Sequence, residues 1–247
     1  MTTNFQTPLN PASLAGTVPR IEQVTGIEQL ADAVAARVKS AVDESVRKYG
    51  AASLVLSGGS TPEIYLPRIA SLDLPWDAVS VLLADERWVD ESSAYSNTAM
   101  LRRILLSQPG PARARFVPLK NNSPTAEAGV ASTRAGMLSI DQPYSIVLLG
   151  MGNDGHIASL FPGTPGLHEL LAPENRLRVA AIPAPTTAAP HVERISLTLA
   201  EIRRSDHVML VLQGNSKLDV LRRAYAAGDA LQTPVVALGD VEVLWCP

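Results

Sequence analysis

The sequence predicts an α/β protein with a Rossmann-like fold, that is, a mostly parallel sheet with helices on both faces. Short runs that are apolar at nearly every position alternate along the chain with longer stretches of helical spacing. Such runs are typical of parallel strands, because helices cover both faces of their sheet. Glycine-rich or charged segments follow several of these runs, and ligands bind at the carboxyl ends of parallel strands.

The first predicted element is a helix over residues 27–49, because apolar residues from Ile27 to Val42 recur at helical spacing. Strand-like runs and helical stretches then alternate. The predicted strands are residues 53–56, 79–84, 146–149, 179–182 and 208–212, with shorter ones near Phe116, Ile195 and Val235. The predicted helices are residues 62–70, 96–106, 124–138 and 217–227. Residues 183–190 are rich in proline and alanine and predict a surface loop near the ligand site.

We expect residues 1–20 to be a flexible leader and residues 21–247 to form a single α/β domain. The first residues are polar and lack the basic and apolar regions of a signal peptide. No apolar run approaches the roughly 20 residues of a membrane helix. The net charge of −3 gives no indication of a nucleic acid or membrane partner. The single cysteine, Cys246, cannot form an internal disulfide, so a cytoplasmic location fits best.

The segment after the predicted strand 146–149 carries the strongest indication of chemistry. Its glycines Gly150, Gly152 and Gly155 match the dinucleotide fingerprint, but prolines and glycines from Pro162 onward stop any full helix, which that fingerprint requires. We therefore do not expect nicotinamide or flavin binding. The same loop presents Asp154 and His156 together, and a histidine beside a carboxylate is suited to proton transfer. These two residues are the candidate catalytic pair.

A second candidate loop, SGGSTP at residues 57–62, follows the predicted strand 53–56. Its proline is expected at the first position of a helix, with Ser60 or Thr61 as the cap. Gly58 and Gly59 would let an anion approach the free N–H groups at the helix start. The loop lacks the lysine of a Walker motif, so it predicts phosphate binding without nucleotide hydrolysis. A simple strand-to-helix turn is the alternative.

The third loop begins with Asp85, Glu86 and Arg87, and Asn97 opens the next predicted helix. Asp85 and Arg87 could hold sugar hydroxyls and a phosphate, since the arginine fork suits phosphate oxygens. If extended geometry persists, Glu86 points the opposite way. A surface salt bridge is the alternative reading of this segment.

Two further cations are candidate phosphate ligands. Lys217 lies in the first turn of a predicted helix, where a base is unfavourable unless an anion is present. Arg194 precedes the apolar run near Ile195 and could add a second cation. Each could instead be a solvated charge. With four histidines and one cysteine, the chain offers no cluster that predicts a metal site.

Five of these segments together resemble the 6-phosphogluconolactonases of the glucosamine-6-phosphate isomerase/6-phosphogluconolactonase family. They are SGGSTP at 57–62, DERWVDESSAYSN at 85–97, GMGNDGHIASLFPG at 150–163, RISLT at 194–198 and GNSK at 214–217. The resemblance implies a cofactor-free hydrolase of the pentose phosphate pathway that opens 6-phosphoglucono-δ-lactone to 6-phosphogluconate. It also implies a Rossmann-like fold shared with glucosamine-6-phosphate deaminase. The family often has a lysine shortly before RISLT, and residues 183–190 contain none.

The resemblance suggests a mechanism, stated here as a hypothesis. His156 acts as a general base toward water, and Asp154 orients the imidazole or the water. Arg87 and Lys217 hold the phosphate together with the loop 57–61, and Arg194 assists. The expected partner is a small phosphosugar lactone, with no cofactor or metal, and the protein is expected to be a monomer or a small homo-oligomer.

Three alternatives are weighed against this hypothesis. Glucosamine-6-phosphate deaminases usually have a glutamate after the DGH loop, where this chain has Phe161, and an aromatic residue in place of Arg87. A Ser-His-Asp hydrolase would need a G-x-S-x-G elbow, which is missing. A non-catalytic sugar-phosphate sensor with a DNA-binding domain would need more chain before Ile27. The lactonase is favoured over all three.

Overall fold

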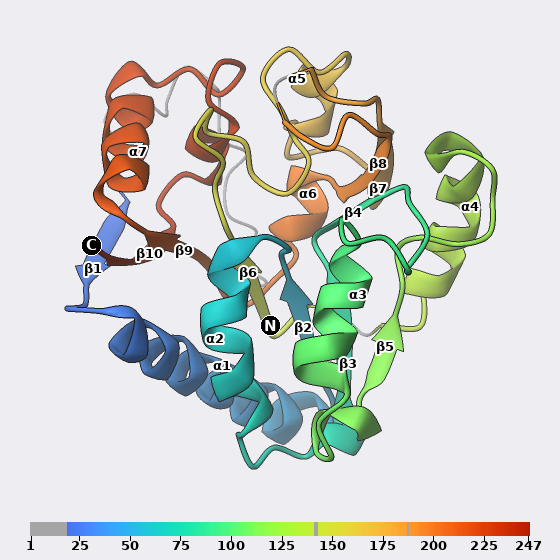
Figure 1. Cartoon of the computed structure of the whole chain (residues 1–247), viewed down its shortest axis with the longest axis vertical. Helices are drawn as coiled ribbons and strands as arrows, with labels where there is room; N and C mark the ends of the chain where they lie inside the picture. The colour runs from blue at the N-terminus through green and yellow to red at the C-terminus, as the bar shows by residue number, and fades with distance from the viewer. Residues whose placement is uncertain (1–18, 141–142, 187) are drawn as a thin grey trace, which may run out of the picture.

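A computed structural model of the protein describes residues 19–140, 143–186 and 188–247. In these residues, seven strands form one sheet in the order β1-β10-β9-β6-β2-β3-β5, and every neighbouring pair is parallel (Figure 1). The predicted mostly parallel α/β sheet is confirmed. The strands are β1 (Arg20–Gln23), β2 (Ala52–Leu56), β3 (Val79–Leu83), β5 (Arg115–Val117), β6 (Ile146–Leu149), β9 (Val208–Gln213) and β10 (Glu242–Cys246).

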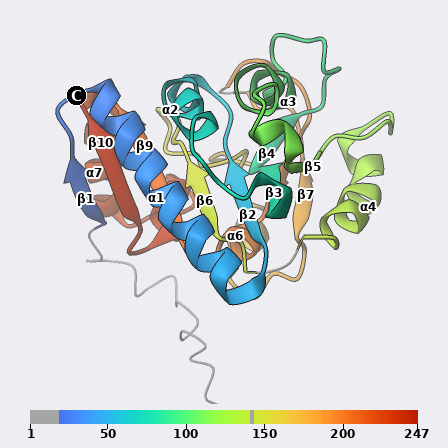
Figure 2. The same ribbon diagram turned by 90° about the horizontal axis from the view of Figure 1, so that it is seen from below.

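Helices cover both faces of this sheet. Helices α1, α2 and α3 lie on one face, and α7 lies on the other (Figures 1 and 2). This arrangement follows from right-handed crossovers, because β2 leads to β3 in one direction along the sheet and β9 leads to β10 in the other. The helices are α1 (Ile27–Tyr49), α2 (Ser60–Ala70), α3 (Asn97–Leu101), α4 (Ala126–Met137), α5 (Leu167–Leu170), α6 (Leu199–Ile202) and α7 (Asn215–Ala227).

The direction of the chain along the sheet reverses between β2 and β6. Strand β2 continues outward to β3, whereas the adjacent β6 continues toward β9 and β10. Such a switch point opens a crevice at the carboxyl ends of the strands, because the two following connections leave on opposite sides. The loops after β2 and β6, which carry the glycine-rich segments, flank this crevice.

The core lies between the sheet and its helices. Strands β2 and β6 are buried at every position, as their continuous apolar sequences predict. Helix α1 buries one stripe that includes Leu30, Val34 and Val38, and it ends at Gly50, whose φ of +75° is a left-handed conformation that glycine adopts without strain. All the buried hydrophobic residues except Ala126 and Ala200 form one cluster. The expected single domain over residues 21–247 stays a prediction.

Three of the short strands lie outside the parallel sheet. Strands β4 (Asp85–Arg87), β8 (Arg194–Leu197) and β7 (Val179–Ile182) form a separate antiparallel sheet in that order. The sequence predicted β7 and β8 as strands but gave no sign that they pair apart from the main sheet. This small sheet stands near the carboxyl ends of β2 and β3 (Figure 1), so its residues reach the same edge as the loops of the large sheet.

Several predicted boundaries are wrong. The strand expected near Val235 is a 3₁₀ helix, Pro234–Leu238, and the last strand is β10, which was not predicted. Strand β1 was also missed, since the expected leader ended at residue 20 and Arg20 is the first residue of β1. β1 is an edge strand with mostly exposed polar residues, so it lacks an apolar run. Residues 1–18 of the expected leader lie outside the described residues.

Helix α2 begins earlier than predicted. Gly59 is its N-cap with a φ of +100°, and Ser60 is the first helical residue, so Pro62 does not occupy the first position. No side chain caps this helix start. Its first N–H groups are therefore left for solvent or a ligand. The predicted helix over 96–106 is confirmed in two parts, α3 followed by a π-helical turn, Arg102–Leu106.

Candidate active site

Four loops meet at the carboxyl edge of adjacent parallel strands. They follow β2, β3, β6 and β9, which are neighbours in the sheet order β9-β6-β2-β3. Parallel strands all end at the same edge, so the topology brings together segments that are far apart in the sequence. These are the same segments in which the sequence predicted functional residues.

Asp154 and His156 form a close pair in the loop after β6. The His156 ring atom Nδ1 lies 2.5 Å from Asp154 Oδ1, and the backbone N–H of His156 donates to the same oxygen at 3.2 Å. Gly155, with a φ of +79°, makes the turn that brings the two side chains together. Burial alone would raise the pKa of Asp154, but the hydrogen bond and charge of His156 outweigh burial and lower it. An ionised carboxylate therefore accepts from the imidazole.

Gly152 makes room for this pair. A Cβ atom placed on Gly152 would lie 2.1 Å from His156 Nδ1 and 2.5 Å from Asp154 Oδ1, distances too short for any real contact. The N–H of Gly152 also donates to the carbonyl oxygen of His156 at 2.9 Å, which closes the loop. The glycines here serve the Asp154–His156 pair, whereas the dinucleotide fingerprint would have placed them against a pyrophosphate.

Gly58 and Gly59 lie at the start of α2 and have different structural roles. A Cβ on Gly58 would lie 1.9 Å from Asn97 Oδ1, so its missing side chain leaves space for Asn97. Asn97 Nδ2 donates to the carbonyl oxygen of Asp85 at 3.0 Å, which links the second and third predicted loops. Gly59 turns the chain into α2, whose first turn contains Ser60 and Thr61.

Strand β4 presents Asp85 and Arg87 on one side and Glu86 on the other, as predicted. Glu86 is buried and accepts the backbone N–H groups of Asn97 and Thr98 at 2.8 and 2.7 Å, so it holds the start of α3. Burial raises the pKa of Glu86, although these hydrogen bonds partly oppose the shift. Asp85 is 5% exposed and accepts a hydrogen bond from Ser159 Oγ at 2.5 Å.

Arg87 and Arg194 lie directly opposite each other in the antiparallel pair of β4 and β8. Their Nε atoms are buried and make no hydrogen bond within the described part of the chain. Arg87 donates from one terminal nitrogen to the carbonyl oxygen of Tyr95 at 2.7 Å, and Arg194 donates to those of Ala189 and Pro190 at 3.3 Å. Burial lowers the pKa of Arg194; the charge of Asp85 opposes this shift, and the charge of Arg87 adds to it. Two facing cations with unused donors favour a bound anion.

Lys217 points back from the first turn of α7 to the loop after β6. Its Nζ donates to the carbonyl oxygen of Met151, beside the Asp154–His156 loop. Burial lowers the pKa of Lys217, and the negative charge of Asp154 opposes this shift. Gly214, with a φ of +90°, is the N-cap of α7 and makes no side-chain cap. This helix start therefore combines free N–H groups with a half-buried ammonium group.

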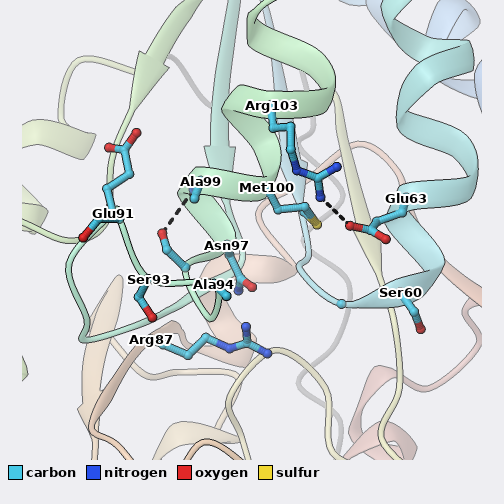
Figure 3. Close-up of a pocket in the computed structure, with 13 residues that line it drawn as sticks. Ser60, Glu63, Arg87, Glu91, Ser93, Ala94, Asn97, Ala99, Met100 and Arg103 are labelled. Carbon is cyan, nitrogen blue, oxygen red and sulfur yellow. Dashed lines mark hydrogen bonds and ion pairs between the residues drawn. The ribbon is translucent and has the colours of Figure 1, made fainter.

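A cavity of about 550 Å³ opens beside these loops, between the start of α2, strand β4 and helix α3. In Figure 3, Arg87 and Asn97 project into the same space, and Ser60 and Glu63 of α2 stand on its other side. Gly59 also lines the cavity. Of the other predicted site residues, Gly58 and Asp85 contact Asn97. The remaining four do not line this cavity: Asp154 and His156 lie in the loop after β6, Arg194 in β8 and Lys217 in α7. Thr61 lies one residue into α2 from Ser60 and is partly exposed.

Two residues of the site were not predicted from the sequence. Ser159, which is fully buried, bonds to Asp85 as described and connects the loop after β6 to β4. The ring of Phe161 lies against the His156 ring with centroids 4.2 Å apart, and the Arg194 guanidinium carbon lies 5.0 Å from the Phe161 centroid. Both follow His156 within five residues, but a sequence of apolar and hydroxyl residues does not reveal which side chains turn inward.

The residues that the structure describes contain no cluster of three or more His, Cys, Asp or Glu side chains that could hold a metal ion. Within the same residues, no helix has both the length and the apolar character needed to cross a membrane.

Comparison with known proteins assigns the chain to a family. The profile of the family described as glucosamine-6-phosphate isomerases/6-phosphogluconolactonase matches residues 26–245, which include every loop of the site. The chain belongs to this family. A 6-phosphogluconolactonase from Rhizobium meliloti (strain 1021) is 34% identical to it over 252 residues, with 100% of both chains covered. A 6-phosphogluconolactonase from Pseudomonas aeruginosa is 37% identical, with 92% of this chain and 91% of the relative covered.

A solved structure supports the same assignment. The crystal structure of a 6-phosphogluconolactonase from Shewanella baltica matches with a TM-score of 0.88 and 35% identity, and the match covers 93% of this chain and 98% of that one. This likeness over nearly the whole length confirms both the resemblance seen in the sequence and the predicted fold class.

Proposed function

We propose that this protein is a 6-phosphogluconolactonase, which hydrolyses 6-phosphoglucono-δ-lactone to 6-phosphogluconate in the pentose phosphate pathway. One observation carries the proposal beyond family membership. The ring of Phe161 contacts both Arg194, a candidate phosphate ligand, and His156, the candidate base. The Arg194 guanidinium carbon and the His156 ring centroid lie 5.0 Å and 4.2 Å from the Phe161 centroid. A phosphorylated sugar held by the arginines would therefore have its other end within reach of the histidine.

His156 is the proposed general base. With its Nδ1–H donated to Asp154, the Nε2 atom carries the lone pair that accepts a proton. Water attacks the carbonyl carbon of the lactone while its proton moves to Nε2, and a tetrahedral oxyanion forms. The bond from that carbon to the ring oxygen then breaks, and the ring oxygen takes the proton back from the His156 imidazolium to become a hydroxyl group, which leaves His156 neutral again. Ionised Asp154 stabilises the imidazolium. Base catalysis of this kind contributes about 10²–10⁴-fold.

The phosphate is proposed to lie between Arg87 and Arg194. Their buried Nε donors would be satisfied by phosphate oxygens, and the anion would relieve the repulsion between the two facing cations. The free N–H groups at Gly59 and Ser60, together with the hydroxyls of Ser60 and Thr61, would supply further donors. Lys217 is proposed to add positive charge from the start of α7.

Gly58 and Asn97 support the sugar end of this site. We propose that Asn97 and Asp85 contact the sugar hydroxyls, since an amide and a carboxylate are suited to polyols. Gly58 contributes by leaving the space that Asn97 occupies. The further expectations, a single domain at residues 21–247, a cytoplasmic location and a monomer or small homo-oligomer, also stay proposals.

The test is the rate at which freshly made 6-phosphoglucono-δ-lactone disappears at neutral pH, compared with its spontaneous hydrolysis. Ammonia release from glucosamine 6-phosphate is measured alongside. We expect faster lactone loss without ammonia, and a decrease in kcat of about 10²-fold or more in His156→Gln. Ammonia release would instead assign the deaminase reaction, and binding of 6-phosphogluconate without turnover of either compound would assign a sensor.

The deaminase is less well supported by the site itself. After the DGH loop this chain places Phe161, a residue that is 2% exposed and whose ring packs on His156. No carboxylate other than Asp154 is hydrogen-bonded to the ring of His156 in the described residues. The residue that would assist ring opening in the deaminases is thus replaced by an apolar contact.

A further inference from the structure

Phe161 occupies an unusual position between two functional groups. Its ring is buried, with 2% of the residue exposed. The His156 ring lies 4.2 Å from it at an interplanar angle of 43°, and the Arg194 guanidinium lies over it at 5.0 Å. If Phe161 only filled space in the core, any large apolar side chain would be sufficient at this position. Contact with one imidazole and one guanidinium requires the flat face of an aromatic ring.

The backbone of the loop is bent so as to reach this position. Ala158 has a φ of +47°, the only positive φ among non-glycine residues of the described chain. The N–H of Leu160 donates to the carbonyl oxygen of Ile157 at 2.9 Å and closes a tight turn around it. An alanine in the left-handed region costs about 1–2 kcal/mol, and such strain persists where the surrounding structure requires it. The turn sends Ser159 toward Asp85 and Phe161 back onto His156.

Arg194 depends on few other contacts for its orientation. Its Nε makes no hydrogen bond in the described residues, and one terminal nitrogen donates to two carbonyl oxygens at 3.3 Å, near the long limit for such bonds. The flat guanidinium is therefore oriented in large part by the ring beneath it. The same ring lies against His156, whose other restraint is Asp154.

We infer that Phe161 is a positioning residue that holds the phosphate-binding Arg194 and the imidazole of His156 in a fixed relation to each other. This rests on the proposed function for its catalytic consequence. A phosphate fixed by Arg194 then places the lactone carbonyl at a constant distance from the base. Misplacement of a base by about 1 Å can cost up to about 10²-fold in rate, so a shared ring is an effective way to set that distance.

The kinetic test compares Phe161→Leu with Phe161→Tyr. Leucine is apolar and buried as easily but has no aromatic face, whereas tyrosine keeps the ring. We expect Phe161→Leu to lower kcat by about 10-fold with a smaller change in KM, and Phe161→Tyr to restore most of kcat. Equal kcat in the wild type and Phe161→Leu, or equal losses in the leucine and tyrosine variants, would overturn the inference.

Phe116 provides the matched control. It is a phenylalanine of the edge strand β5 with an arginine, Arg102, at 5.1 Å from its ring centroid. Phe116→Leu therefore removes the same kind of contact outside the site, and kcat should stay within about 2-fold of the wild-type value, as for a change remote from the reacting groups.

A second measurement does not depend on turnover. The ring current of Phe161 should shift the carbon-bound ring protons of His156 in the ¹H NMR spectrum, where the chain contributes four histidines and His156→Gln identifies the signal. Titration with inorganic phosphate should move this signal in the wild type and Phe161→Tyr, and much less in Phe161→Leu. An equal response in Phe161→Leu would refute the positioning role. If the wild type fails to hydrolyse the lactone, the proposed function is wrong, and the phosphate titration still decides whether Phe161 links the two groups.

Discussion

Arg87 and Arg194 face each other across strands β4 and β8, and each keeps a buried Nε without a hydrogen bond in the described residues. Like charges directly opposite in an antiparallel pair destabilise the pair. Buried donors without a partner add a further cost. An arrangement that is unfavourable when empty becomes favourable with a bound dianion, so this pair marks the proposed phosphate site more specifically than either arginine alone.

We therefore expect opposite effects on binding and on stability when one arginine is removed. Arg87→Met should raise KM by at least about 10-fold, because hydrogen bonds to charged groups contribute about 1.5–3 kcal/mol. Without phosphate, its melting temperature should equal or exceed that of the wild type, since the repulsion is gone. Phosphate should raise the melting temperature of the wild type and have little effect on the variant, which differential scanning calorimetry can measure. The exposed Arg113, paired with Asp77, is the control, and Arg113→Met should keep KM. A wild-type KM in Arg87→Met would contradict the phosphate assignment.

A substitution of Gly152 tests whether the Asp154–His156 pair must lie close to the backbone of its loop. In Gly152→Ala, the new Cβ would meet His156 Nδ1 at 2.1 Å, so the imidazole must move. We expect kcat to fall by about 10²-fold, the cost of a misplaced base, with KM little changed. Gly136→Ala is the matched control, since a Cβ there meets nothing within 4 Å, and helix α4 should gain about 0.5–1 kcal/mol from it. Steady-state kinetics and urea unfolding measure both. Full activity in Gly152→Ala would show that the pair need not be held as observed.

Lys217 predicts a pH dependence of anion binding. Burial lowers its pKa below 10.5, against the opposing charge of Asp154. The ammonium form attracts phosphate, so its contribution is present at pH values below the folded pKa and is lost as the pH rises through it. As the pH rises, we expect phosphate binding to weaken at a lower pH than it would if an exposed lysine supplied this charge. Isothermal titration calorimetry on the wild type and Lys217→Arg can test this, because arginine keeps its charge throughout. The same alkaline loss in both proteins would exclude Lys217 as its source.

Ala158 predicts a stability effect that is separate from chemistry. At a φ of +47°, a β-branched residue is more strained than alanine, so Ala158→Val should lower the free energy of unfolding by about 1–2 kcal/mol. Ala158→Gly should differ from the wild type by less than about 1 kcal/mol, because relief of strain offsets the extra freedom of the unfolded chain. Urea denaturation of the three proteins gives these values. If valine were tolerated as well as glycine, the turn would not be strained.

The sequence alone was sufficient to predict features that depend on neighbouring residues in the chain. The apolar runs of β2, β3, β6 and β9 predicted buried parallel strands, and their following loops contained Asp154, His156 and Arg87. It was sufficient because strand burial and helix spacing leave a periodic pattern within a few residues. The alternation at residues 85–87 even predicted that Glu86 points away from its neighbours, which the structure confirms.

The tertiary structure decided which distant residues meet. Strands β1 and β10 pair at the edge of the sheet without a clear local pattern, and the facing of Arg87 and Arg194 depends on the register of two strands more than 100 residues apart. The inward turn of Ser159 and Phe161 depends in the same way on what packs against their loop. By itself the sequence determined the α/β class, most of the central strands and longer helices, and the loops that carry charge. The pairing and register of the strands and the contacts of Phe161 were decided only in the folded chain. They arise from packing between distant segments, and the local sequence of one segment does not specify which other segment it will contact.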